Sequence, residues 1–72
     1  MDLRVQAEYD DGSDSAHIAF DPILDGEVTQ NIVIDDPRLQ DGEIVVDLDS
    51  NGHVLGIEVI GVRAVISRPH IQ

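Results

Sequence analysis

The chain has 72 residues, with fifteen acidic residues against four arginines and no lysine, which gives a formal net charge of −11. A chain this short forms one small domain that buries only about 60% of its unfolded surface. Its negative charge repels phosphate backbones, so we expect no direct binding of nucleic acid. The absence of cysteine excludes disulfides and thiolate metal sites.

Targeting features are also missing from the sequence. No stretch is long and apolar enough for a membrane span, and the first ten residues, MDLRVQAEYD, lack the basic start and apolar centre of a signal peptide. We therefore expect a cytoplasmic protein that does not bind membranes. A single β domain is expected over residues 1–72, with an ordered core at about residues 3–66 and a loose tail after it.

The first predicted element is a β-hairpin. Residues 3–10 and 15–20 contain apolar side chains at alternating positions, which is typical of half-buried strands. A two-residue turn at Asp11-Gly12 would pair Val5 with Ile18 and place the apolar side chains of both strands on one face.

The next segments are less regular. Tyr9 lies at the rim of the first hairpin, where its hydroxyl is expected to reach water or the Asp14 carboxylate. A third strand is predicted at about residues 27–34, and residues 35–42 have the composition of a surface loop. Residues 62–67 match either a strand continuation or a single helical turn, because their apolar spacing satisfies both periods.

Residues 47–58, DLDSNGHVLGIE, match the calcium-loop pattern D-x-[DN]-x-[DN]-G-x5-E. In that interpretation Asp47, Asp49 and Asn51 supply oxygen ligands, and Glu58 closes the site with its carboxylate. The residues lie between two β-branched runs instead of two helices, however, and this context favours a hairpin. We therefore predict no metal and no other cofactor, with these four residues as the candidate ligands of a calcium-binding alternative.

The hairpin interpretation predicts a definite register. With Asn51-Gly52 as a two-residue turn, six aliphatic residues share one face, which we expect to form the core. A slip of one residue would mix apolar and polar positions, so the pattern specifies the register. The expected pairs are Leu48 with Leu55, Val46 with Ile57, and Ile44 with Val59.

Two motifs carry a resemblance to a known family. The first includes Tyr9, Asp10 and Asp14 in EYDDGSDSAHIAF, and the second lies in GEIVVDLDSNGHVLGIEVIGV, with matches at Asp47, Asp49, Gly52, Gly56, Ile57 and Glu58. Over about residues 3–66 the chain resembles the bacterial YuzE-like family of small proteins of unknown function. It departs from the family pattern at His17, where an aromatic or aliphatic residue is usual. The resemblance implies a small, mostly antiparallel β domain without an assigned enzymatic activity.

No catalytic motif accompanies these features. The three histidines, His17, His53 and His70, are far apart in the sequence, and no serine is joined to an activating base in a recognisable pattern. We therefore predict a protein that is not an enzyme. Glu58 is the carboxylate of most interest, because apolar neighbours and Asp47 would raise its pKa. The alternative is a partly exposed glutamate that pairs with an arginine.

The predicted fold is mainly β, either all-β or α+β: a single antiparallel sheet of four or five strands built from two hairpins, with at most one short helix. Val45, Val54, Glu58 and Ile60 fall on the face opposite the predicted core, so we expect an interaction surface there and a homo-oligomer.

The leading functional hypothesis is a small acidic protein-interaction module with a basic protein partner. The resemblance makes this concrete as an antitoxin-like partner of a basic toxin-like nuclease. The alternatives are a calcium-binding hairpin module and a small carboxylate-based hydrolase. The charge itself has a second explanation, a solubilising surface on a protein from a GC-rich or salt-loving organism.

Overall fold

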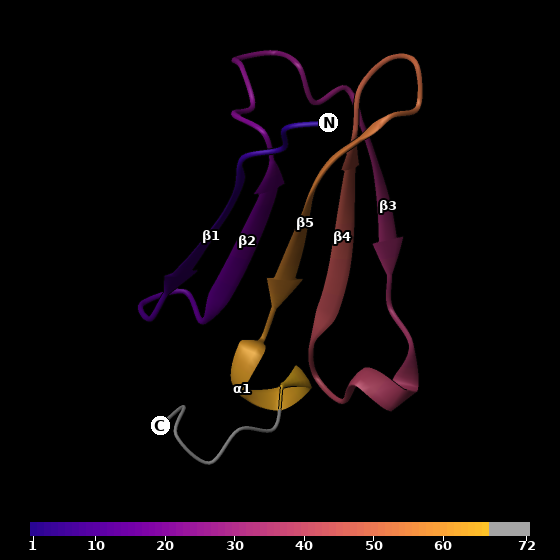
Figure 1. Ribbon diagram of the computed structural model, residues 1–72. Helices are drawn as coiled ribbons and strands as arrows, with labels where there is room; N and C mark the ends of the chain where they lie inside the picture. The colour runs from indigo at the N-terminus through magenta and orange to yellow at the C-terminus, as the bar shows by residue number, and fades with distance from the viewer. Residues whose placement is uncertain (67–72) are drawn as a thin grey trace.

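The computed structural model describes residues 1–66, and within them the chain forms one open, five-stranded sheet in which all neighbours are antiparallel. The strand order is β1-β2-β5-β4-β3 (Figure 1). The predicted mainly β class, with at most one short helix, is confirmed. The elements are β1 Val5–Asp10, β2 Ser15–Phe20, β3 Gln30–Ile34, the 3-10 turn η1 Pro37–Leu39, β4 Glu43–Leu48, β5 Val54–Ile60 and the helix α1 Val62–Val65.

The β1–β2 hairpin has the predicted faces but a different register. Val5 pairs with Phe20 instead of the expected Ile18, a shift of two residues. The connection therefore contains residues 11–14, four residues instead of two. A shift of two leaves every side chain on its predicted face, because side chains alternate with a period of two.

The loop between β1 and β2 is fastened to the start of α1. The Tyr9 hydroxyl donates a hydrogen bond to Asp14 Oδ1 at 2.9 Å, one of the two outcomes expected from the sequence. The Asp14 carbonyl accepts hydrogen bonds from the backbone N–H groups of Gly61 and Val62, both at 3.0 Å. The Arg63 guanidinium forms ion pairs in the same loop and lies 6.0 Å from the centre of the Tyr9 ring.

The β4–β5 hairpin keeps the predicted register over most of its length. Residues 43–47 pair as expected, but a bulge after Asp47 makes Leu48 pair with Val54 instead of Leu55. The predicted two-residue turn is therefore wrong. A five-residue connection, residues 49–53, joins the strands, and within it the Asp49 N–H donates to the His53 carbonyl. Gly52, with φ of +82°, has the left-handed conformation that glycine adopts without strain.

The remaining segments complete the sheet. β3 is shorter than predicted, and residues 21–29 connect it to β2 across the ends of β5 and β4 (Figure 1). The segment after β5 forms a helical turn, one of the two predicted possibilities, and the expected loose tail lies outside the described residues.

The two faces of the sheet differ sharply in chemistry. Side chains that are paired directly across strands point to the same side. One side, the aliphatic face, has no charged strand residue. It consists of Val5, Ala7, Tyr9, Ala16, Ile18, Phe20, Gln30, Ile32, Ile34, Ile44, Val46, Leu48, Ile57 and Val59. The other side, the mixed face, contains His17, Asp47 and Glu58 together with apolar residues.

Most of the buried strand residues lie on the mixed face, whereas the sequence predicted that the aliphatic face is buried. Ala19, Val45, Asp47 and Gly56 of the mixed face are buried, whereas Val59 alone is buried among the strand residues of the aliphatic face. The prediction that the aliphatic face forms the core is therefore wrong. Part of the reason is that Ile23 and Val28 of the β2–β3 connection lie over the mixed face, where they line a cavity with His17, Asp47 and Glu58. Strand alternation cannot reveal this arrangement.

Candidate functional site

A cluster of polar side chains lies on the mixed face where three central strands meet. His17 on β2 pairs directly with Glu58 on β5, and Asp47 on β4 pairs with Gly56, two residues before Glu58. Because Gly56 has no side chain, His17 Nε2 reaches diagonally across β5 to within 3.4 Å of Asp47 Oδ2.

The Gly56 position has no room for a side chain. A Cβ atom there would lie 2.7 Å from the Ile18 carbonyl oxygen and 3.1 Å from His17 Nε2. Real Cβ atoms essentially never approach a backbone oxygen so closely. Gly56 therefore permits both the β2–β5 pairing and the contact between His17 and Asp47.

Asp47 is the buried centre of the cluster. Its side chain belongs to a residue that is only 4% exposed, and Oδ1 accepts a 2.7 Å hydrogen bond from Asn31 Nδ2 on β3. Buried carboxylates are stable only with such partners. Asn31 and His17 satisfy the two oxygens of Asp47 from opposite sides.

Glu58 has an altered acidity in this setting. Burial raises the pKa of Glu58, and the hydrogen bond and negative charge of Asp47 raise it further, while His17 opposes the change. This direction agrees with the expectation from the sequence. Burial and the neighbouring Asp47 carboxylate therefore both disfavour the ionised form of Glu58.

The cluster forms the floor of a cavity of about 360 Å³. Its walls include Ile23 and Val28 from the β2–β3 connection, and its polar lining residues are His17, Asn31, Asp47 and Glu58. These groups can hold or exchange a proton and can accept hydrogen bonds. Among residues 1–66, the lining includes no serine, threonine, cysteine or lysine, so its only candidate nucleophiles are its carboxylates and the imidazole of His17.

The calcium-pattern residues do not come together as one coordination site. Asp49 Oδ1 accepts hydrogen bonds from the backbone N–H groups of Asn51 and His53, and Asp49 Oδ2 lies 3.1 Å from His53 Nδ1. These contacts, led by the His53 backbone bond, lower the pKa of Asp49. Within residues 1–66, no three histidine or acidic side chains are grouped so that they could hold a metal ion.

Comparison with known proteins identifies a family. A family model described as a protein of unknown function, DUF2283, matches residues 6–63. The chain belongs to this family. No curated protein and no solved structure matches the chain. Both the His17–Asp47–Glu58 cluster and the bulge after Asp47 lie inside the matched region.

The predicted interaction residues occupy different environments. Ile60 is exposed, Glu58 is half-buried and Val45 is buried on the mixed face. Val54 is exposed, but the bulge pairs it with Leu48, so it does not share the face of Glu58 as predicted. The predicted surface patch is therefore smaller than the sequence indicates.

Within the described part of the chain, no helix has the length and apolar character that a membrane crossing requires.

Sequence reasoning missed His17 and Asn31 as partners of Asp47. Both contacts depend on which strands are neighbours, and the β2–β5 and β3–β4 pairings join segments far apart in the chain. The one available signal was Gly56, a glycine within a strand opposite an acidic residue, which indicates a bulge or a close approach.

Proposed function

We propose that this chain is a non-enzymatic protein-interaction module. The observation that supports this function is the aliphatic face, a sheet surface without charged strand residues that residues 1–66 leave largely uncovered. A sheet with one apolar face needs a second layer, and on soluble proteins large exposed apolar patches mark interaction sites.

The charge of the chain favours a basic heterologous partner. The chain has fifteen acidic residues and only four arginines. Two of these arginines, Arg38 and Arg63, are already paired with aspartates of the chain itself. Opposite charge accelerates encounter, and apolar contacts then hold the complex. Exposed Ile60, beside half-buried Glu58, is the apolar anchor available on the mixed face.

The resemblance to YuzE-like proteins makes the partner more specific. In this form of the proposal, the chain is an antitoxin-like protein that binds a small basic nuclease encoded by a neighbouring gene. The calcium alternative is less favoured, since the Asp49 carboxylate is engaged in its own loop. A hydrolase at the cavity would have to rely on Asp47 and Glu58, because the described lining residues include no serine, threonine, cysteine or lysine.

The test is direct binding of the purified chain to the small basic protein encoded beside its gene, measured by calorimetry at low and high salt. Ile60→Arg should weaken binding about tenfold or more, because it replaces an apolar anchor with a charge that repels the partner. Leu24→Arg is the control, since Leu24 is an exposed apolar residue of the β2–β3 connection and lies on no strand.

A complex that is lost with Ile60→Arg and retained with Leu24→Arg supports the module and its mixed-face anchor. If neither this neighbour nor any basic protein recovered from the native host binds the purified chain at low salt, the heterologous function is wrong.

A further inference from the structure

The aliphatic face is continuous across the whole sheet. Two rows of side chains each cross all five strands without a polar interruption, apart from the Tyr9 hydroxyl at one edge. The first row is Ala7, Ile18, Ile57, Val46 and Ile32, and the second is Tyr9, Ala16, Val59, Ile44 and Ile34.

The centre of this face lacks the burial of a core. Ile57 and Ile18 lie on adjacent inner strands and Val46 lies on the next, yet all three remain partly accessible to water. In a two-layer domain such positions are covered by the second layer. At the β3 edge, Ile32 is 51% exposed. Within residues 1–66, the short helix α1 lies at one end of the sheet and does not form a second layer (Figure 1).

The accessible area of the chain is larger than that of a compact monomer. The chain exposes 5390 Å², whereas a folded 7.9 kDa monomer exposes about 4,400 Å². The excess of about 1,000 Å² belongs to the whole chain, its loops and ends included. A dimer of standard size, which buries roughly 800 Å² on each partner, would remove an area of this order.

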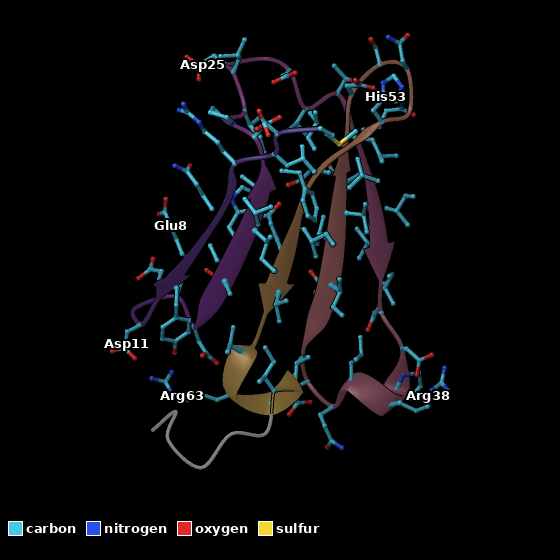
Figure 2. All side chains as sticks on the ribbon, viewed as in Figure 1. Glu8, Asp11, Asp25, Arg38, His53 and Arg63 are labelled. Carbon is cyan, nitrogen blue, oxygen red and sulfur yellow. The ribbon has the colours of Figure 1, made fainter. Side chains whose placement is uncertain are left out.

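The distribution of charge permits a second copy to approach this face. The strand residues of the aliphatic face include no acid, and Glu8, Asp11 and Asp25 lie at the periphery of the sheet and its loops (Figure 2). The acids on the mixed face point away from a copy that docks on the aliphatic face. Face-to-face pairing thus buries apolar surface without placing unpaired charges in the interface centre.

We infer that a second copy of this chain covers the aliphatic face. The two sheets pack face to face about 10 Å apart, with their strands within about 30° of each other, and form a two-layer sandwich with twofold symmetry. This inference rests on the proposed function, because it assigns the aliphatic face of the interaction module to self-association. The mixed face and the acidic loops stay on the outside, available to a basic partner.

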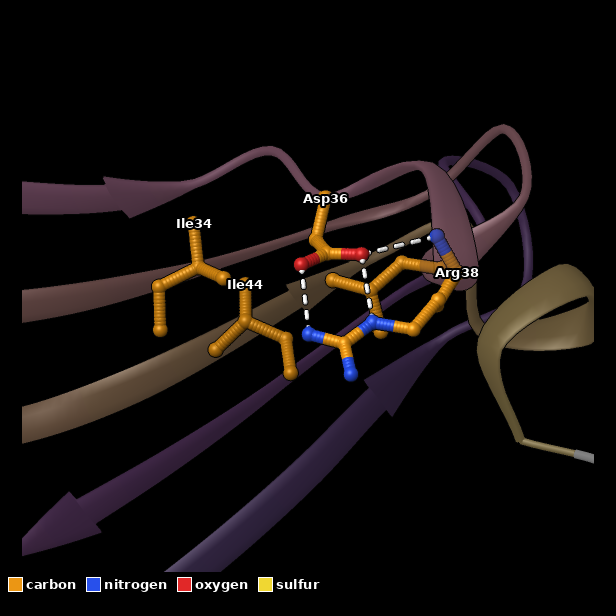
Figure 3. A pocket seen from close by; sticks show the side chains of 5 residues that line it. Ile34, Asp36, Arg38 and Ile44 are labelled. Atoms are coloured by element: carbon orange, nitrogen blue, oxygen red, sulfur yellow. Dashed lines mark hydrogen bonds and ion pairs between the residues drawn. The ribbon is translucent and has the colours of Figure 1, made fainter.

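A cavity lies at the edge of the aliphatic face and could receive a side chain of the second copy. Ile34, Ile44 and Leu39 line a cavity of about 350 Å³, and Asp36 and Arg38 form an ion pair beside them (Figure 3). Two hydrogen bonds from the Arg38 side chain and one from its backbone N–H hold Asp36 in place. The cavity is a receptor for an apolar side chain of the second copy, bordered by charges that are already neutralised.

The test is sedimentation equilibrium of the purified full chain, with two variants on the same edge strand. Ile32→Asp places a charge on the aliphatic face, whereas Val33→Asp places it on the mixed face at a residue of similar exposure, 57% against 51%. The wild type and Val33→Asp should have twice the mass of the chain. Ile32→Asp should weaken dimerisation about tenfold or more.

A second measurement applies even if Ile32→Asp fails to fold. Because the chain contains no cysteine, Ile32→Cys and Val33→Cys each carry a single site for a spin label. Ile32→Cys should give a dipolar distance between copies and reduced label mobility, and the label on Val33→Cys should stay mobile.

A wild type that is monomeric at millimolar concentration overturns the inference, whether the face is then covered by the chain's own remaining residues or by a different protein. A monomer that still binds the basic partner through Ile60 contradicts the dimer and leaves the proposed function intact. A dimer that binds no basic partner contradicts the heterologous function alone.

Discussion

The buried carboxylate of Asp47 and the half-buried carboxylate of Glu58 lie close to each other and to His17. Asn31 and His17 contact Asp47, and Glu58 faces the negative charge that remains. Protonation of Glu58 removes this repulsion and supplies a hydrogen-bond donor to Asp47.

The pH dependence of stability follows from the raised pKa of Glu58. A group whose pKa is higher in the folded state stabilises the fold below its unfolded pKa and loses this contribution as the pH rises through the folded value. Glu58→Gln keeps the donor at every pH, so at pH 8 it should raise the free energy of unfolding by about 1 kcal/mol, the usual value of one neutral hydrogen bond.

Urea denaturation at pH 4 and pH 8 measures this effect, and the gain should shrink at the lower pH. Glu43→Gln is the control, because Glu43 is half-buried on the same face but does not line the cavity. Equal stability of Glu58→Gln and the wild type at pH 8 would show that the two carboxyl groups do not interact as described.

At the scale of elements, the β2–β5 pairing depends on Gly56. A Cβ atom at this position would meet the Ile18 carbonyl oxygen at 2.7 Å, and a strand backbone cannot move away without loss of its ladder hydrogen bonds. Gly56→Ala should therefore destabilise the fold by about 2 kcal/mol, as overpacking typically does.

Gly12→Ala is the matched control for thermal and urea denaturation. Gly12 lies in the β1–β2 loop, its nearest neighbour to a new Cβ is Asp10 Oδ1 at 3.4 Å, and its φ is not in the left-handed region. Its replacement should change stability by less than about 1 kcal/mol. Similar losses from both substitutions would mean that the close approach at Gly56 does not limit the sheet.

The two hairpins differ in how well the sequence predicted their strand registers. Alternation predicted the composition of both faces and the register of residues 43–47, because a one-residue slip would mix apolar and polar side chains. It could not predict the register of β1 and β2, since a shift of two residues preserves both faces. The two registers differ only in the length of the loop, which contains residues 11–14 in the structure, and loop length leaves no periodic pattern.

The sequence could not predict which face is covered or which residues form the polar cluster, and the reason is different. Both depend on the path of residues 21–29 and on the pairing of β2 with β5, which join segments distant in the chain. Alternation shows that a strand has two different faces but carries no information about which one another segment covers. For this reason the sequence identified Glu58 but neither His17 nor Asn31 as a neighbour of Asp47.

At the scale of the whole molecule, the net charge of −11 acts on folding, self-association and partner binding with different signs. Repulsion among the acids opposes the compact state and the approach of a second copy, whereas the same charge attracts a basic protein. Salt screens all three interactions, with a Debye length of about 10 Å at 0.1 M.

Raising sodium chloride from 20 mM to 500 mM should therefore strengthen folding and dimerisation and weaken the basic complex. The melting temperature should rise by several degrees, equivalent to about 1 kcal/mol for a domain of this size. Calorimetry and sedimentation across this range measure the three responses. The double variant Glu8→Gln, Asp25→Asn, which removes two peripheral charges, should show a smaller salt effect in each case. Dimerisation that weakens with salt would mean that ion pairs, and not the aliphatic face, hold the two copies together.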